Sequence, residues 1–205
     1  MQGGGGTVPP GPAPVAADRP FTLAEVGWQP RLPPVEEAGA TPAQLAALEA
    51  CPPGQRNSVY FRTLALDAGS LGERGALFTT VMYAPRGLPR AERELSTAVV
   101  SMVNGCVYCC AVHARRFVEL TKQEAAMRRL FTDGLAAETD PRRRAIVDFS
   151  ALLTAAPGAV SPAALAPLRA ARLDDLELLD LIHCVAMFAN ANRLMQSLGD
   201  SILPE

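Results

Sequence analysis

The dipeptide Asn104-Gly105 separates two helical segments in the middle of the chain, and it constrains the fold more than any other feature of the sequence. The segment 88–103 has Pro89 in its first turn and carries apolar residues at helical spacing, namely Leu95, Ala98, Val99 and Met102. Asparagine and glycine readily adopt the left-handed conformation that ends a helix. We therefore expect the chain to reverse here and to form an antiparallel hairpin of two helices.

The segment that follows this stop carries a C-x-x-C dithiol one helical turn before a histidine. Three of the five cysteines lie between Cys106 and Cys110, and His113 is one of only two histidines. Because residues three and four apart share a helix face, Cys109 can meet both Cys106 and His113. Cα atoms at this spacing lie about 5 to 5.5 Å apart, within the range of about 4.4 to 6.8 Å that a disulfide needs. The spacing predicts thiol redox chemistry.

A carboxylate can reach the same place from the other helix. Glu94 lies ten residues before Asn104 and His113 eight residues after Gly105, which corresponds to about 15 and 12 Å along the two helices. An antiparallel hairpin brings both residues to nearly the same level. A carboxylate that orients an imidazole, which in turn activates a nucleophile, is the arrangement of a catalytic triad. We also expect the helix N-terminus and the imidazole to lower the pKa of a motif thiol.

The pattern E-x11-C-x-x-C-x-x-x-H, formed by Glu94, Cys106, Cys109 and His113, resembles the signature of the alkylhydroperoxidase D (AhpD-like) branch of the carboxymuconolactone decarboxylase superfamily. The resemblance is specific over 88–131. It is weaker over 188–193, which looks like the closing helix of the uncharacterised peroxidase-related group. It implies an all-α fold, an AhpD-like helical bundle with a catalytic antiparallel helix hairpin, and assembly into homo-oligomers.

The same resemblance implies the site roles and the partners. Carried over by position, Cys109 would be the peroxidatic thiol, Cys106 the resolving thiol, His113 the proton carrier and Glu94 its orienting carboxylate. Hydroperoxides would be reduced through a cysteine sulfenic acid without any further cofactor, and a thioredoxin-like or lipoylated partner would restore the dithiol. Alkylhydroperoxidase D proper has a second histidine just before its second motif cysteine, where this chain has Tyr108. No role of that histidine is therefore carried over.

Three other interpretations use the same residues. A general disulfide oxidoreductase would act on protein thiols, and a redox sensor would form the disulfide without turnover. A structural zinc site is disfavoured because its ligands usually come as two separated pairs, whereas the four candidates here are local. We interpret Cys110 as a small buried packing residue, Cys51 and Cys184 as inert, and His183 as a core histidine on the apolar pattern of the last helix. The remaining polar side chains of that helix are interpreted as packing or interface groups, namely Asn190, Asn192 and Arg193.

Composition indicates one domain with a tail. At 205 residues and 49% hydrophobic, the chain can bury one core over 20–205, preceded by a flexible Gly/Pro-rich tail over 1–19. A net charge of -2 gives no support for nucleic-acid binding. No apolar run approaches about 18 residues, so we expect no membrane span. The N-terminus lacks the features of a secretory signal, so we expect a cytoplasmic protein. The aliphatic surplus favours burial between subunits.

Helix starts recur along the rest of the sequence with their expected chemistry. Proline follows a capping residue at Thr41, Asp140 and Ser161, and Thr121 with Glu124 forms the pattern of a capping box. The last helix is expected from about 174 to 199. The Pro-rich stretch 28–34 is expected to wrap extended over the domain, and no β alternation is evident.

Overall fold

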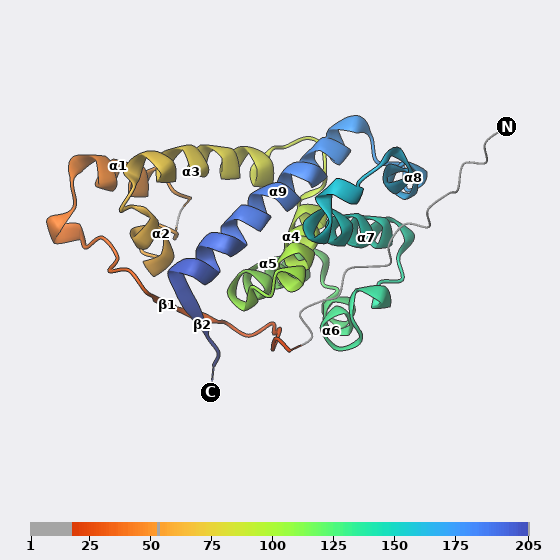
Figure 1. Ribbon diagram of the computed structural model, residues 1–205, viewed down its shortest axis with the longest axis horizontal. Coiled ribbons are helices and arrows are strands. Elements are labelled where there is room, and N and C mark those ends of the chain that lie inside the picture. Colours follow the sequence, from red (N-terminus) through yellow and green to blue (C-terminus); the bar gives the residue numbers. More distant parts are fainter. Residues whose placement is uncertain (1–17, 53, 205) are drawn as a thin grey trace.

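The computed structural model describes residues 18–52 and 54–204, so the predicted tail over 1–19 lies almost entirely outside it. Within these ranges the chain forms nine α-helices, three short 3-10 helices and one two-stranded sheet (Figure 1). In chain order the elements are β1 (Gly27–Pro30), η1 (Glu37–Gly39), α1 (Pro42–Glu49), α2 (Val59–Leu64), α3 (Ala68–Tyr83), α4 (Arg90–Val103), α5 (Val107–Thr121), α6 (Glu124–Asp133), η2 (Leu135–Ala137), α7 (Pro141–Ala155), η3 (Pro157–Ala159), α8 (Pro162–Ala170), α9 (Asp175–Leu198) and β2 (Gly199–Ile202). The predicted all-α class is confirmed.

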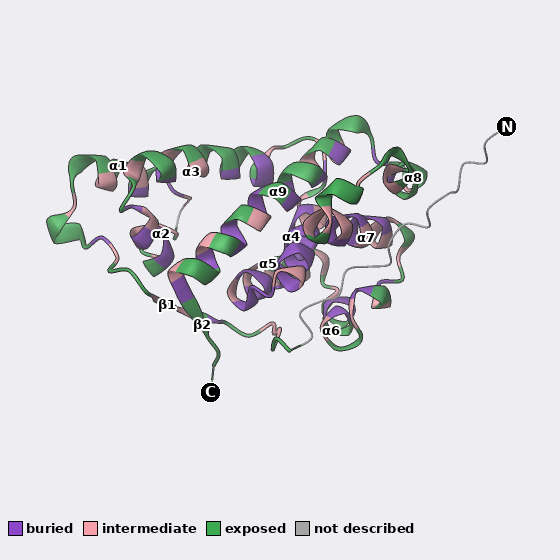
Figure 2. Cartoon of the chain, in the orientation of Figure 1, coloured by how far each residue is buried: buried purple, intermediate pink, exposed green. Residues whose placement is uncertain are grey.

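The predicted hairpin of α4 and α5 forms the centre of the molecule. α4 packs against α5, α7 and α9, and every one of its residues from Arg93 to Met102 is buried (Figure 2). Its small hydroxyl side chains allow this close packing because each one bonds back to its own helix. Thr97 donates to the carbonyl of Arg93, and Ser101 donates to that of Thr97. The hairpin is thus held rigidly at the level where Glu94 lies.

Arg93 fixes the start of α4 by hydrogen bonds to neighbouring segments. Its guanidinium is 1% exposed and donates to the carbonyls of Val81, Arg86 and Leu88 and to the Asp180 carboxylate, the last at 2.8 Å. These bonds satisfy a buried cation and join the α3–α4 connection to α9. The start of α4 is therefore fixed to the helix that crosses it.

α9 runs diagonally through the view of Figure 1, beside the hairpin, and packs against α4. It begins with a full capping box, in which Asp174 accepts from the backbone of Glu177 and the Glu177 side chain accepts from the backbone of Asp174. Its inner face adds Leu181, Phe188 and other apolar residues to a core shared with α3, α7 and α8. The predicted bounds of about 174 to 199 agree with this helix.

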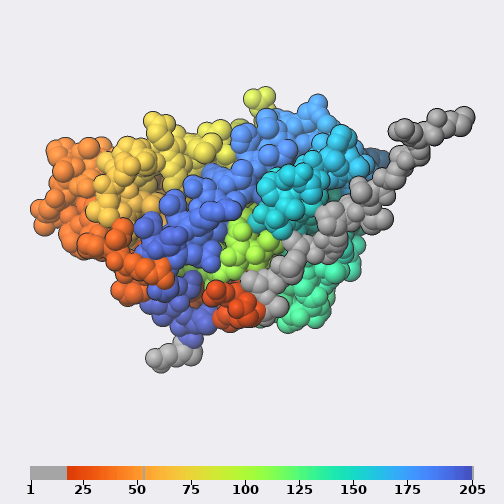
Figure 3. All heavy atoms as spheres, viewed as in Figure 1, coloured from red at the N-terminus to blue at the C-terminus, as the bar shows by residue number. Residues whose placement is uncertain are grey.

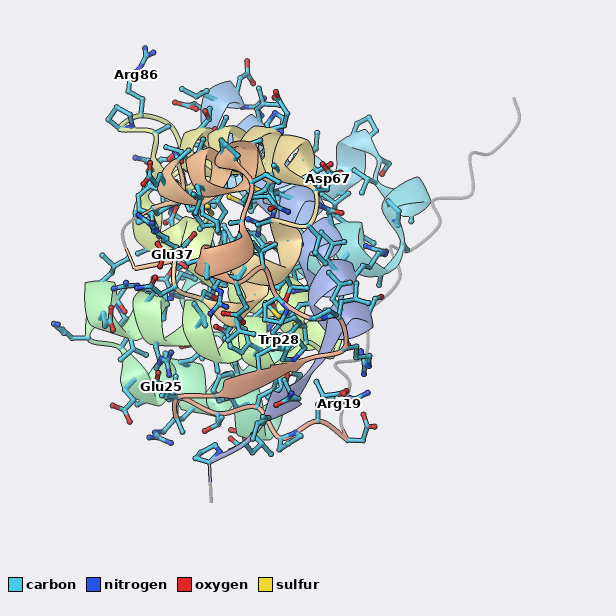
Figure 4. The ribbon with its side chains drawn as sticks, turned by 90° about the vertical axis from the view of Figure 1, so that its left-hand side faces the viewer. Arg19, Glu25, Trp28, Glu37, Asp67 and Arg86 are labelled. Atoms are coloured by element: carbon cyan, nitrogen blue, oxygen red, sulfur yellow. The ribbon has the colours of Figure 1, made fainter. Side chains whose placement is uncertain are left out.

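The two-stranded sheet is the one departure from the expected all-helical pattern. β1 pairs antiparallel with β2, from Gly27 opposite Ile202 to Pro30 opposite Gly199. The stretch from Trp28 is extended, as predicted. The sequence predicts no β-strands, and this prediction is wrong here. Trp28 lies on this ribbon, and its indole donates to the carbonyl of Met195 at 3.1 Å (Figure 4). The ribbon fastens the end of α9 to the N-terminal segment.

Most predicted helix starts agree with the structure, and one does not. Thr41 forms a capping box, and the Asp140 side chain accepts from the backbone of Arg143. The capping box predicted for Thr121 is wrong, because Thr121 is the last residue of α5 and its hydroxyl donates to Phe117. Lys122 then turns left-handed with a φ of 62°, and α6 begins only at Glu124.

α3 and α9 form much of one surface of the molecule (Figure 3). Several large apolar side chains remain exposed on them, namely Leu77 and Tyr83 on α3 and Leu176, Leu179 and Ile182 on α9. Exposed apolar side chains of this kind are often covered by a second subunit. The homo-oligomer remains a prediction, and this surface is where we expect the subunits to meet. Among the described residues, no helix combines the length and apolar character needed to cross a membrane.

Candidate active site

The turn between the two central helices fixes the position of the first motif cysteine. Gly105 has a φ of +71°, the left-handed conformation predicted for this stop. The backbone N–H of Gly105 donates to Met102, and that of Cys106 donates to Ser101 at 2.8 Å. This pair of bonds is a Schellman motif, which satisfies the last carbonyls of α4. Cys106 is at the same time the N-cap residue of α5, so its sulfur lies at a helix N-terminus.

Glu94 lies in the interior and faces the imidazole of His113. Its side chain is fully buried, and Oε2 lies 2.5 Å from Nδ1 of His113. The predicted contact across the hairpin is therefore present. The other carboxylate oxygen accepts from Arg90, whose Nε lies 2.7 Å away. Burial would raise the pKa of Glu94, but His113 and then Arg90 outweigh it, and the pKa is lowered. Glu94 is a carboxylate at neutral pH.

The imidazole of His113 is held on two sides. Nδ1 faces the Glu94 carboxylate, and the ring meets Phe188 of α9 edge-on, with centroids 4.4 Å apart. A ring nitrogen beside a carboxylate carries the proton, so the neutral imidazole presents an unprotonated Nε2. His113 and Cys109 line the same cavity. The arrangement can accept and return a proton at that cavity.

The two sulfurs of the dithiol are both free thiols in this structure, and they ionise unequally. A hydrogen bond from the Cys109 thiol lowers the pKa of Cys106 against the effect of burial, and the Cys109 backbone and Asn192 lower it further. The same shared hydrogen bond, followed by burial, raises the pKa of Cys109. The first negative charge on the pair therefore rests on Cys106, at the helix N-terminus. The lowered pKa that we expect of a motif thiol is therefore found at Cys106 and not at Cys109, and His113 is not among its causes.

Asn192 belongs to the site, although we do not predict this from the sequence. It is fully buried on α9, accepts from the Asn104 amide at 3.0 Å and donates to Ser101 at 3.1 Å. Its side chain also lowers the pKa of both Cys106 and Cys109. Asn192 thus ties the hairpin turn to α9 and supplies a donor to the dithiol. The one signal in the sequence is a pair of asparagines in an otherwise apolar helix.

A cavity of about 230 Å³ opens in front of Cys109 and His113. Cys106 does not line it, so Cys109 presents the accessible sulfur of the pair. The walls are mostly apolar and aromatic and come from α2, α3, α5 and α9. The larger side chains among them are Tyr60, Phe61, Arg74, Phe78, Tyr108, Phe188 and Met195. A compact organic molecule can reach the sulfur and the imidazole together.

The interpretations of the other cysteines and of the second histidine agree with the structure in part. Cys110 is fully buried among core residues, as expected for a packing residue, and burial raises its pKa well above the usual value. Cys184 is likewise buried, and its pKa is raised to about 12, chiefly by burial. His183 is exposed on the outer face of α9, so its interpretation as a packing residue within this chain is wrong. In the described part of the chain, no three His, Cys, Asp or Glu side chains group together as metal ligands would.

Residues 74–151 match the model of the carboxymuconolactone decarboxylase family, and this region contains both central helices. No curated protein matches the chain significantly in sequence.

Solved structures with the same fold cover most of the chain. An alkylhydroperoxidase AhpD core structure, an uncharacterized peroxidase-related protein from Ralstonia eutropha, is 25% identical with a TM-score of 0.71, over 82% of this chain and 90% of that one. An uncharacterized peroxidase-related protein from a Silicibacter species is 24% identical with a TM-score of 0.67, over 83% and 92%. The debrominase Bmp8 is 14% identical with a TM-score of 0.65, over 80% and 87%. The last two likenesses concern the fold alone.

Proposed function

Since the chain belongs to the superfamily of alkylhydroperoxidase D and carboxymuconolactone decarboxylase, we propose that it is a thiol-dependent peroxidase that reduces organic hydroperoxides. One observation carries the proposal. The buried Glu94 carboxylate holds Nδ1 of His113 at 2.5 Å, and the same imidazole lines a cavity together with the accessible sulfur of Cys109. A plain packing role would not need a buried carboxylate, an imidazole and a dithiol in one place.

In the first step Cys109 is the nucleophile. His113 Nε2 accepts the proton of the Cys109 thiol, and the sulfur attacks the terminal oxygen of the hydroperoxide. The O–O bond breaks, a sulfenic acid forms on Cys109, and the proton carried by His113 passes to the departing alkoxide to give the alcohol. The positive charge that the imidazole carries in between is stabilised by Glu94, which remains ionised.

In the second step Cys106 resolves the sulfenic acid. It is the sulfur of the pair that ionises first, so its thiolate attacks the sulfur of Cys109 and a disulfide forms. Hydroxide leaves and is protonated to water. The sum is one hydroperoxide and two thiols converted to one alcohol, one water and one disulfide. The lowering of the Cys106 pKa, which at first sight conflicts with attack by Cys109, thus suits the resolving thiol.

An external dithiol must then reduce the disulfide. A thioredoxin-like or lipoylated protein is the partner that we propose, and the short C-x-x-C loop keeps its disulfide reducible because little chain entropy is gained on closing it. We also propose that the protein is a homo-oligomer and that it works in the cytoplasm, where its five free thiols suit a reducing compartment.

The test follows consumption of cumene hydroperoxide with dithiothreitol as reductant. Wild-type protein and the control Cys51→Ala should turn over repeatedly, because Cys51 does not line the cavity. Cys109→Ser should consume none above background. Cys106→Ser, tested without dithiothreitol, should stop after one equivalent and hold a trappable sulfenic acid on Cys109. If wild-type protein exchanges disulfides but consumes no hydroperoxide, the general disulfide oxidoreductase is correct instead. A single oxidation without turnover would favour the redox sensor.

A further inference from the structure

Three buried polar atoms without a hydrogen-bond partner gather in the cavity beside Cys109. They are the hydroxyl of Tyr60, Nη1 of Arg74 and Oε1 of Gln55. None of the three makes a hydrogen bond of good geometry among the described residues, although the Arg74 side chain lies near enough to the Tyr60 oxygen to lower the pKa of that phenol in part. Buried polar groups are nearly always bonded, and an unbonded one costs about 1 to 3 kcal/mol. Three around one cavity indicate that the missing partners belong to a ligand.

Of the three side chains, Arg74 would bind a ligand most strongly because it carries a charge. Within the described residues it has no carboxylate at salt-bridge distance. Its guanidinium carbon lies 5.7, 5.2 and 5.8 Å from the ring centroids of Tyr60, Phe61 and Phe78. The rings hold the cation in place but do not neutralise it. An anion that enters the cavity would find a positioned guanidinium with free donors.

Tyr60 supplies a second donor beside this cation. Its side chain is 3% exposed and is wedged edge-on between Trp28 and Phe61, with centroids 5.4 and 5.5 Å away. Burial raises the pKa of Tyr60 to about 12, so the phenol keeps its proton at neutral pH. The side-chain amide of Gln55 can turn either its oxygen or its nitrogen toward a ligand. Tyr60, Arg74 and Gln55 thus present polar groups to a cavity whose remaining walls are mostly apolar.

We propose that this cavity selects organic hydroperoxides that also carry a carboxylate, with the carboxylate bound by Arg74 and Tyr60 and the apolar body lying against Phe78 and Phe188. The inference rests on the proposed function, since it names the substrate class of the same site. The cavity of about 230 Å³ is near the small end of ligand sites, so the substrate is compact, as an aryl or short-chain hydroperoxide is.

The experiment compares cumene hydroperoxide with its para-carboxylate derivative, which differ only in the charged group. Wild-type protein should show a kcat/KM about tenfold or more higher for the carboxylate, the effect of one charge-assisted hydrogen bond in a partly buried site. Arg74→Gln should lose this preference, so that kcat/KM becomes similar for the two substrates, and Arg74→Lys should recover part of it. Tyr60→Phe keeps the ring packing and should reduce the preference several-fold. Arg128→Gln, an exposed control on α6, should change nothing.

A binding measurement separates this inference from the peroxidase proposal. Calorimetry with the alcohol product of the para-carboxylate substrate, and with its neutral methyl ester, needs no turnover. Carboxylate binding that depends on Arg74, in a protein that consumes no hydroperoxide, would support the anion site and refute the peroxidase. Equal kcat/KM for both hydroperoxides, unchanged in Arg74→Gln and Tyr60→Phe, would overturn the carboxylate site and leave the peroxidase standing. Thermal unfolding of each variant checks that the fold is intact.

Discussion

Replacing Glu94 by glutamine removes the buried charge on which the proposed proton relay depends. The carboxylate accepts from Nδ1 of His113 at 2.5 Å and from Nε of Arg90 at 2.7 Å. Glutamine has one accepting and one donating end, so it cannot accept from both partners. Its NH₂ either faces Arg90, donor against donor, or faces His113 and requires the other tautomer of the imidazole. Breaking a buried pair costs about 3 to 5 kcal/mol. Because Arg90 is 28% exposed and can regain water, we expect a loss of about 2 to 4 kcal/mol in the free energy of unfolding at pH 7.

Activity should fall further than stability alone explains. Without the carboxylate, His113 loses both its fixed tautomer and the stabilisation of its charged form, so kcat/KM for hydroperoxide should fall by about 10² to 10⁴. Urea unfolding measures the stability, and a ferrous-oxidation assay for remaining hydroperoxide measures the activity. The activity is measured under conditions where the variant is fully folded.

The stability difference should also depend on pH. A carboxylate whose pKa is lowered by folding stabilises the protein fully above its unfolded pKa of about 4.3, and this stabilisation is lost as pH falls through the folded value. The difference in the free energy of unfolding between wild type and Glu94→Gln should therefore be constant near neutral pH and should decrease below about pH 4. A gap that is independent of pH down to acid unfolding would contradict the assignment of a buried charge.

Glu138→Gln is the matched control. Glu138 is 5% exposed, is paired with Arg143 at 3.0 Å and has a pKa that this pairing lowers against the effect of burial. It precedes α7 and does not line the cavity. Its replacement should cost stability but spare hydroperoxide consumption. Equal activity losses in the two variants, or full activity in Glu94→Gln, would refute the relay.

Two further predictions concern the surroundings of the site. Asn192→Leu removes a donor to the dithiol, so the pH at which the first thiol becomes reactive to iodoacetamide should rise; an unchanged profile would exclude this role. Gly87 has a φ of +78°, and a Cβ there would overlap the Asp180 carboxylate. Gly87→Ala should therefore lower the melting temperature, while Gly72→Ala within α3, where a Cβ meets nothing within 4 Å, should stabilise the protein by about 0.5 to 1 kcal/mol. The reverse order in thermal melts would contradict this reasoning.

Local sequence was sufficient to predict the central hairpin. The reversal at Gly105 depends on a left-handed residue next to a helix end, and the meeting of Glu94 with His113 depends only on the rise of two helices from that turn. Local chemistry was also sufficient for the cap at Asp140. It failed at Thr121, because the hydroxyl bonds back to the helix that it ends.

The remaining features depend on contacts between segments that are distant in the sequence. β1 and β2 are four residues each and lie at opposite ends of the chain, so neither has a pattern of its own. Asn192, Arg74 and Tyr60 join the site only because α9, α3 and α2 pack around the hairpin. The greater acidity of Cys106 follows from its place at the N-cap and from the shared thiol proton, which the spacing alone does not assign.

Titration of free thiols after one equivalent of hydroperoxide, with the new bond located by mass spectrometry, tests the central claim most directly. All five cysteines are free at the start. We predict that three thiols remain, since five less two is three, and that the single disulfide joins Cys106 to Cys109. If all five thiols survive, or if the disulfide involves Cys51, Cys110 or Cys184 instead, the account of this dithiol as a peroxidase centre is wrong.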